Sequence, residues 1–276
     1  MNADYTALDK PDVLMFLFHP RREHGVSQPR SPVSPLEIPG MTDVQVPVEE
    51  HTVVGARFHL KDRSHANILF FHGNGEIAAD YDDIAPFYNR IGINFLAVDY
   101  RGYGRSTGHP TVTSMMRDSH TIFRFVTEWL SQNGFTGPLI LMGRSLGSAS
   151  AIELAEAHAD RVCGLIVESG FAFAGPLLRL LGVDPAAIGF REERTFRHLA
   201  KLAQFRGPVL VIHAEFDHII PFSDGQALFE ASASPNKTLL KIPRANHNDI
   251  LAHGFQDYFA AVQRLVASCS SPALFK

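Results

Sequence analysis

Ser145 is the residue of this sequence best suited to act as a nucleophile. It stands at the centre of residues 143–147, Gly-Arg-Ser-Leu-Gly, after the apolar run Pro138 to Met142 and before the helix-compatible run Ser148 to His158. A G-x-S-x-G pentapeptide between a strand and a helix is typical of a sharp turn, the nucleophile elbow, which projects the serine hydroxyl above the sheet. The glycines let strand and helix approach, and the helix N-terminus favours developing negative charge. We therefore predict that Ser145 attacks an acyl carbonyl.

A serine hydroxyl needs a base to remove its proton, and His247 is the histidine best placed for this role. It lies after the strand-like run Thr238 to Ile242 and before the last helix, so it should face the same edge of the sheet as Ser145. His218 and His253 are the alternatives. His213 closes an apolar strand and is expected to pack or to bond locally.

The base in turn needs a carboxylate that orients its imidazole ring, and Asp217 is our choice. It follows a buried strand and lies between the serine and the histidine, which gives the chain order Ser, acid, His. Glu215 is close by, and Glu168 ends the preceding strand. Asp224 and Asp249 have the positions of helix-start residues.

The tetrahedral intermediate of acyl transfer needs hydrogen-bond donors for its oxyanion. One should be the backbone N–H of Leu146, the residue after the nucleophile. The second should come from the loop after the apolar strand Ile68 to Phe71, where residues 72–76 read His-Gly-Asn-Gly-Glu. Asn74 is the predicted donor, with Gly75 as the alternative.

Strand-like and helix-like stretches alternate along the chain, which predicts an α/β fold with a mainly parallel, doubly wound sheet of eight strands. The first two strands partly alternate polar with apolar residues, as an antiparallel pair would, and most of the others are short, continuously apolar runs typical of strands covered on both faces. The predicted strands are Asp43 to Glu49, Thr52 to Leu60, Ile68 to Phe71, Phe95 to Val98, Leu139 to Met142, Leu165 to Val167, Val209 to Ile212 and Thr238 to Ile242.

The stretch 169–208 is too long for an ordinary connection and is rich in Phe and Leu, so we expect a small helical cap inserted at a strand's carboxyl end. The rest of residues 41–268 should form one α/β domain, followed by a C-terminal tail at 269–276. Residues 1–40 are expected to be an irregular segment packed on this core. The apolar run Val13 to Phe18 within it is too short for a signal peptide or a membrane span.

Composition limits the other classes of function. The formal net charge of −4 and the absence of a concentrated basic face argue against a nucleic-acid partner. Cys163 lies in an apolar run and Cys269 near a polar end, and at this separation they suggest neither a disulfide framework nor a metal site. We expect no metal, no cofactor, no stable membrane insertion and, by default, a cytoplasmic location; the oligomeric state is open.

Taken together, these features resemble the α/β-hydrolase superfamily from about Val44 to Val266. Residues 99–106, Asp-Tyr-Arg-Gly-Tyr-Gly-Arg-Ser, are similar to a structural turn of that family, so Asp99 is not the expected catalytic acid. This turn, residues 71–75 and Asp217 with its following Ile-Pro pair resemble one branch. That branch holds monoacylglycerol lipases, serine aminopeptidase-like proteins and small depalmitoylating hydrolases. Arg144 departs from the His that lipases often carry before the nucleophile.

The predicted activity is hydrolysis of carboxylic esters with short- to medium-chain acyl or aromatic groups, through an acyl-enzyme on Ser145. The same residues would also serve a thioesterase, an amidase or peptidase, or an acyltransferase. A catalytically idle homologue that binds a ligand is the alternative from another class.

Overall fold

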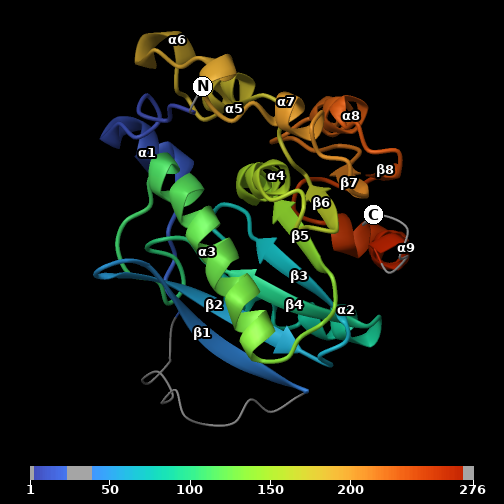
Figure 1. Ribbon diagram of the computed structural model, residues 1–276. Coiled ribbons are helices and arrows are strands. Elements are labelled where there is room, and N and C mark those ends of the chain that lie inside the picture. Colours follow the sequence, from blue (N-terminus) through green and yellow to red (C-terminus); the bar gives the residue numbers. More distant parts are fainter. Residues whose placement is uncertain (1–2, 24–38, 270–276) are drawn as a thin grey trace.

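A single sheet of eight strands organises the computed structural model, which describes residues 3–23 and 39–269 (Figure 1). The strands follow the order β1-β2-β4-β3-β5-β6-β7-β8. β2 runs antiparallel to both β1 and β4, and all remaining neighbours are parallel. The strands are β1 Gly40–Glu49, β2 Thr52–Leu60, β3 Ala66–Phe71, β4 Ile93–Val98, β5 Leu139–Arg144, β6 Gly164–Glu168, β7 Val209–Ala214 and β8 Lys237–Ile242.

Helices cover both faces of this sheet, so the fold has three layers (Figure 1). Residues of α3, α4 and α8 share one apolar core with one face of the strands, and residues of α2 and α9 share the second core with the other face. The helices are α1 Pro11–Leu17, α2 Ala85–Arg90, α3 Val112–Gln132, α4 Ser148–Ala157, α5 Ala174–Leu180, α6 Pro185–Ile188, α7 His198–Leu202, α8 Phe222–Ala231 and α9 Ile250–Cys269, with 3₁₀ turns η1 Ala78–Tyr81, η2 Ser145–Gly147 and η3 Glu192–Arg194.

The two cores explain why the central strands are apolar without alternation. Every residue of β3, β4, β6 and β7 is buried, because side chains on both faces of these strands meet a helical layer. The α/β fold with a mainly parallel sheet of eight strands, expected from the sequence, is therefore confirmed. Its crossovers bring the carboxyl ends of β3, β5, β6, β7 and β8 to one edge.

The stretch between β6 and β7 forms α5, α6, η3 and α7, as the prediction of a helical insertion requires. α5 and α6 lie beyond the carboxyl ends of the central strands, next to α1 (Figure 1). The N-terminal segment is joined to this insertion by main-chain and side-chain contacts. Asp4 N–H donates to the carbonyl of Arg194 over 2.7 Å, and Lys10 Nζ donates to that of Ile188 over 3.1 Å.

The described part of the N-terminal segment packs on the core. Leu8, Val13 and Phe18 are buried, whereas Met15 and Phe16 on α1 are exposed. Residues 24–38 of the predicted segment 1–40 and residues 270–276 of the predicted tail lie outside the described residues. Within the described part of the chain, no helix is long and apolar enough to cross a bilayer.

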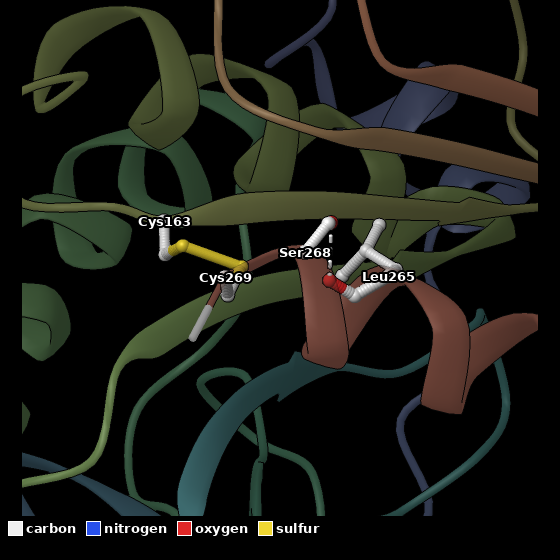
Figure 2. The surroundings of a disulfide bond; sticks show 4 residues. All are labelled: Cys163, Leu265, Ser268 and Cys269. Atoms are coloured by element: carbon white, nitrogen blue, oxygen red, sulfur yellow. Dashed lines mark hydrogen bonds between the residues drawn. A yellow bond between two sulfur atoms is a disulfide. The ribbon is translucent and has the colours of Figure 1, made fainter. Parts of the chain in front are cut away.

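Cys163 and Cys269 form a disulfide, with their Cα atoms 5.6 Å apart (Figure 2). The expectation from the sequence, in which their separation did not suggest a disulfide framework, is therefore wrong on this bond. Because they are 106 residues apart along the chain, the sequence gives no sign that they lie close together in the fold. Cys163 directly precedes β6, α9 packs across β6, and the last residue of α9 is thereby brought beside the start of that strand.

Candidate active site

The turn from β5 into α4 places Ser145 in a strained backbone conformation. Its φ is +50°, in the left-handed region that a residue with a side chain seldom adopts. The flanking glycines make this turn possible. A Cβ on Gly143 would lie 2.3 Å from the carbonyl oxygen of Gly147, and one on Gly147 would lie 2.0 Å from that of Phe71. The G-x-S-x-G spacing thus follows from backbone segments in direct contact.

Three side chains from three strand ends meet at this turn. His247 Nε2 lies 3.1 Å from Ser145 Oγ, and His247 Nδ1 lies 2.7 Å from Asp217 Oδ2. Ser145 follows β5, Asp217 follows β7 and His247 follows β8. All three are buried. This arrangement can take a proton from the serine hydroxyl while a carboxylate stabilises the imidazolium that results.

The carboxylate of Asp217 is held by its own loop. Its Oδ1 accepts the backbone N–H groups of Ile219 and Ile220 over 3.0 and 2.8 Å, which leaves Oδ2 directed at His247. Burial opposes the charged form, but the His247 contact and the two backbone donors outweigh it and lower the pKa of Asp217. Asp217 is therefore charged at neutral pH.

The other histidines near the site have different surroundings. Of the two alternative bases, His218 is exposed. His213 is buried beside Asp217 and pairs its Nε2 with the carbonyl of Ile220 over 2.8 Å, and burial lowers its pKa. His253 lies within α9, with its Nε2 3.5 Å from Asp249. Within the described part of the chain, the histidine hydrogen-bonded to the Ser145 hydroxyl is His247, not one of these three.

The other candidate acids are also engaged elsewhere. Glu215 pairs with Lys241 and accepts the N–H of Arg244, while Glu168 contacts Arg144 and Tyr258.

The two predicted helix-start residues accept hydrogen bonds from backbone N–H groups. Asp224 accepts from Ala172, and Asp249 accepts from Asn246.

The predicted oxyanion loop begins where the elbow touches β3. A Cβ on Gly147 would lie 2.8 Å from the carbonyl of His72 as well as against Phe71, so residues 72–75 start beside the elbow. Two residues outside this loop hold the Asn74 side chain. Its Oδ1 accepts from Tyr103 Oη over 2.7 Å and from the N–H of His19 over 2.9 Å. The assignment of the Asn74 and Leu146 N–H groups as oxyanion donors stays a prediction.

The sequence analysis missed a buried charge cluster around Arg144, the residue before the elbow serine. Arg144 lies within ion-pair distance of Glu76 and Glu168 and donates to the carbonyl of His247. The signal that could have revealed it is the arginine itself. The residue before the serine of such a turn lies at the end of a buried strand, and a buried guanidinium requires carboxylate partners.

The described residues contain no group of three or more His, Cys, Asp or Glu side chains arranged to hold a metal ion.

Comparison with known proteins gives the following matches. The sequence model of a family described as serine aminopeptidase, S33, matches residues 62–183. The chain is 30% identical over 197 residues to alpha/beta hydrolase domain-containing protein 17B of Homo sapiens, with 68% of this chain and 62% of that protein covered. It is 28% identical over 194 residues to protein bem46 of Schizosaccharomyces pombe, with 67% and 62% covered. The chain thus matches less than two thirds of the length of these relatives.

Solved structures share the fold at lower identity. Est1E from Butyrivibrio proteoclasticus with ferulic acid bound is similar with a TM-score of 0.67 and 17% identity, over 81% of this chain and 98% of that one. The Pyrococcus furiosus esterase Pf2001 is similar with a TM-score of 0.66 and 19% identity, over 83% and 92%. The architecture therefore extends well beyond the residues matched by the family model.

Proposed function

The chain belongs to the α/β-hydrolase superfamily, in its serine aminopeptidase- and monoacylglycerol lipase-like branch, and on this premise we propose that it hydrolyses carboxylic esters through an acyl-enzyme on Ser145. One observation carries the proposal. A continuous hydrogen-bonded chain runs from Ser145 Oγ through both ring nitrogens of His247 to Asp217. In a serine hydrolase this chain activates the nucleophile.

Each proposed step uses one of these groups. Ser145 Oγ attacks the ester carbonyl while His247 Nε2 takes the hydroxyl proton. The N–H groups of Leu146 and Asn74 stabilise the negative oxygen of the tetrahedral intermediate. His247 then gives the proton to the leaving alcohol, and the acyl group stays on Ser145. Water, activated by the same histidine, releases the acid, and Asp217 remains charged throughout.

We propose short- to medium-chain or aromatic acyl groups as substrates. The helical insertion beyond the strand ends is rich in Phe and Leu, which favours apolar over sugar or charged substrates. The similar Est1E structure has ferulic acid, an aromatic acid, bound. Thioesterase, amidase or peptidase, and acyltransferase activities use the same chemistry, so thioesters, anilides and acceptor alcohols belong in the same substrate screen.

Substitution of Ser145 tests the proposal. The variant Ser145→Ala should lose hydrolysis of short p-nitrophenyl esters and labelling by a fluorophosphonate probe. The matched control is Ser119→Ala, because Ser119 is also buried and its hydroxyl donates within α3, to the carbonyl of Met116. Unchanged ester turnover in Ser145→Ala would contradict the proposal. Ligand binding without any probe labelling of the unmodified protein would favour the idle homologue.

The cytoplasm stays our predicted location, although the Cys163–Cys269 disulfide weighs against it, because cytosolic reductants keep most thiols reduced. Trapping free thiols by alkylation during cell lysis tests this point. Two alkylated cysteines would agree with a reducing compartment, and none with an oxidising one.

A further inference from the structure

The guanidinium of Arg144 connects three segments that surround Ser145. Its Nη2 donates to the carbonyl of His247 over 2.9 Å, its Nη1 lies 3.3 Å from Glu76 Oε1, and its Nε lies 3.2 Å from Glu168 Oε1. Only 11% of the side chain is exposed. Burial opposes its charge, but the two carboxylates outweigh burial and raise the pKa of Arg144. It is therefore a permanent cation on the residue that directly precedes the elbow serine.

The carboxylate of Glu76 links the Arg144 guanidinium to the predicted oxyanion loop. Glu76 Oε2 accepts the backbone N–H of Gly73 and the hydroxyl of Tyr81, both over 2.7 Å. The loop lies so close to the pair that a Cβ on Gly73 would be 3.0 Å from Glu76 Oε2 and 3.3 Å from Arg144 Nη1. The position of Gly73, one residue before Asn74, is thus set by the Arg144–Glu76 pair.

Glu168 anchors the other side of the guanidinium to the core. Its Oε2 accepts the hydroxyl of Tyr258 over 2.6 Å, and Tyr258 in turn meets the hydroxyl of Tyr88 over 2.9 Å. Burial raises the pKa of Glu168, and Arg144 offsets part of that effect. Tyr88 and Tyr258 are fully buried on α2 and α9, so this anchor is rigid.

From these contacts we infer that Arg144 is a positioning residue for hydrolysis at Ser145: it fixes the oxyanion loop and the His247 loop relative to the elbow. The inference rests on the proposed function. Arg144 has no hydrogen bond to the Ser145 hydroxyl. It acts through the backbone carbonyl of His247 and through the carboxylate of Glu76, which accepts the N–H of Gly73. A planar guanidinium suits this task because it directs several N–H donors in fixed directions, which a lysine ammonium cannot. Displacement of catalytic groups by about 1 Å costs about a hundredfold in rate.

The test compares kcat and KM of single variants on one p-nitrophenyl ester. Arg144→Gln should lower kcat about 10- to 100-fold with KM changed less than about threefold, because the reacting groups are misaligned while the acyl pocket is intact. Arg144→Lys should recover part of that loss. The control is Arg101→Gln, which removes a comparably buried guanidinium paired with Asp118 and Glu49 and should lower stability but not kcat.

Glu76→Gln provides a second variant if Arg144→Gln does not fold. Its amide oxygen can still accept from Gly73 and Tyr81, but the attraction to Arg144 is lost. It should lower kcat several-fold alone and have little further effect in an Arg144→Gln background, since both changes release the same loop.

The possible results separate the inference from the function it rests on. If the unmodified protein neither labels with fluorophosphonate nor turns over an ester, both the proposed function and the inference are wrong. Normal labelling and turnover, with full kcat in folded Arg144→Gln and Glu76→Gln, overturns the inference alone. The inference is also overturned if the Arg144→Gln variant changes KM but not kcat. The same holds if the Arg101→Gln control lowers kcat to the same extent.

Discussion

At the scale of single residues, the contacts of Asp217 divide its two oxygens between loop and base. Backbone N–H groups occupy Oδ1, and His247 Nδ1 contacts Oδ2. This division fixes the carboxylate before any substrate is bound. A protonated Nδ1 that faces Oδ2 leaves Nε2 free to accept the serine proton, as general base catalysis requires.

We expect Asp217→Asn to lower kcat by about 10³- to 10⁴-fold, because an amide at this position favours the wrong imidazole tautomer. Thermal unfolding should change far less than activity, since the amide oxygen can still accept from the loop. Asp224→Asn, at another carboxylate that accepts a backbone N–H, is the control. A loss below tenfold in Asp217→Asn would mean that another group orients His247.

Glu153 on α4 provides a pH-dependent contribution to stability. Burial would raise its pKa, but His120 and Lys201 lower it from 4.5 to about 2. A lowered folded-state pKa means that the stabilisation is complete above pH 4.5 and is lost as the pH falls toward 2. The shift corresponds to about 3 kcal/mol.

Urea unfolding between pH 7 and pH 2 checks this expectation. Glu153→Gln should be less stable at pH 7 and show a flatter dependence below pH 4.5. Glu230→Gln serves as the control, because Glu230 is exposed and its carboxylate accepts from the exposed side chain of Gln226. If both variants follow the pH dependence of the unmodified protein, Glu153 does not contribute to it.

At the scale of elements, the disulfide fastens the end of α9 to the start of β6 (Figure 2). α9 begins three residues after His247 and carries Tyr258, which bonds Glu168 at the other end of β6. The middle of the helix is therefore joined to one end of β6, and its last residue to the other end.

Cys269→Ser should lower the free energy of unfolding by about 2 to 4 kcal/mol, because the cross-link restricts the unfolded chain. Denaturation in urea, with and without dithiothreitol, measures the loss. The unmodified protein under reducing conditions should match the variant, and the variant should not respond to the reductant. Equal midpoints for all four samples would show that the bond does not form in solution.

The sequence predicts elements well where their signal is local. The continuously apolar runs predict the buried strands, and the G-x-S-x-G spacing predicts the elbow that Gly143 and Gly147 require. Interactions between distant segments could not be predicted. Arg144 meets the carbonyl of His247 across 103 positions, and the cysteines pair across 106. Only the crossovers of the sheet bring such groups together.

At the scale of the whole molecule, the N-terminal segment joins three regions. Lys10 donates a hydrogen bond to the helical insertion, and Asp9 Oδ1 accepts the N–H of Val112, the first residue of α3. The backbone N–H of His19 donates to Asn74 Oδ1. The segment is therefore part of the folded unit rather than an appendage.

Leu8→Ala should reduce stability by about 2 to 4 kcal/mol, because Leu8 is buried in the main core and a cavity would remain. Met15→Ala, on the exposed side of α1, should change stability by less than about 0.5 kcal/mol. Guanidinium unfolding of both variants distinguishes an integral segment from a loosely attached one. Equal, small effects would contradict the packing described here.

The disulfide also divides the covalent chain into a ring and two arms. Residues 163–269 form the ring, which includes Asp217, His247 and the whole helical insertion, while Ser145 lies on the arm that leads into it. A protease that cuts once within the insertion therefore releases no fragment, and the nicked protein migrates as one chain until a reductant separates its two pieces.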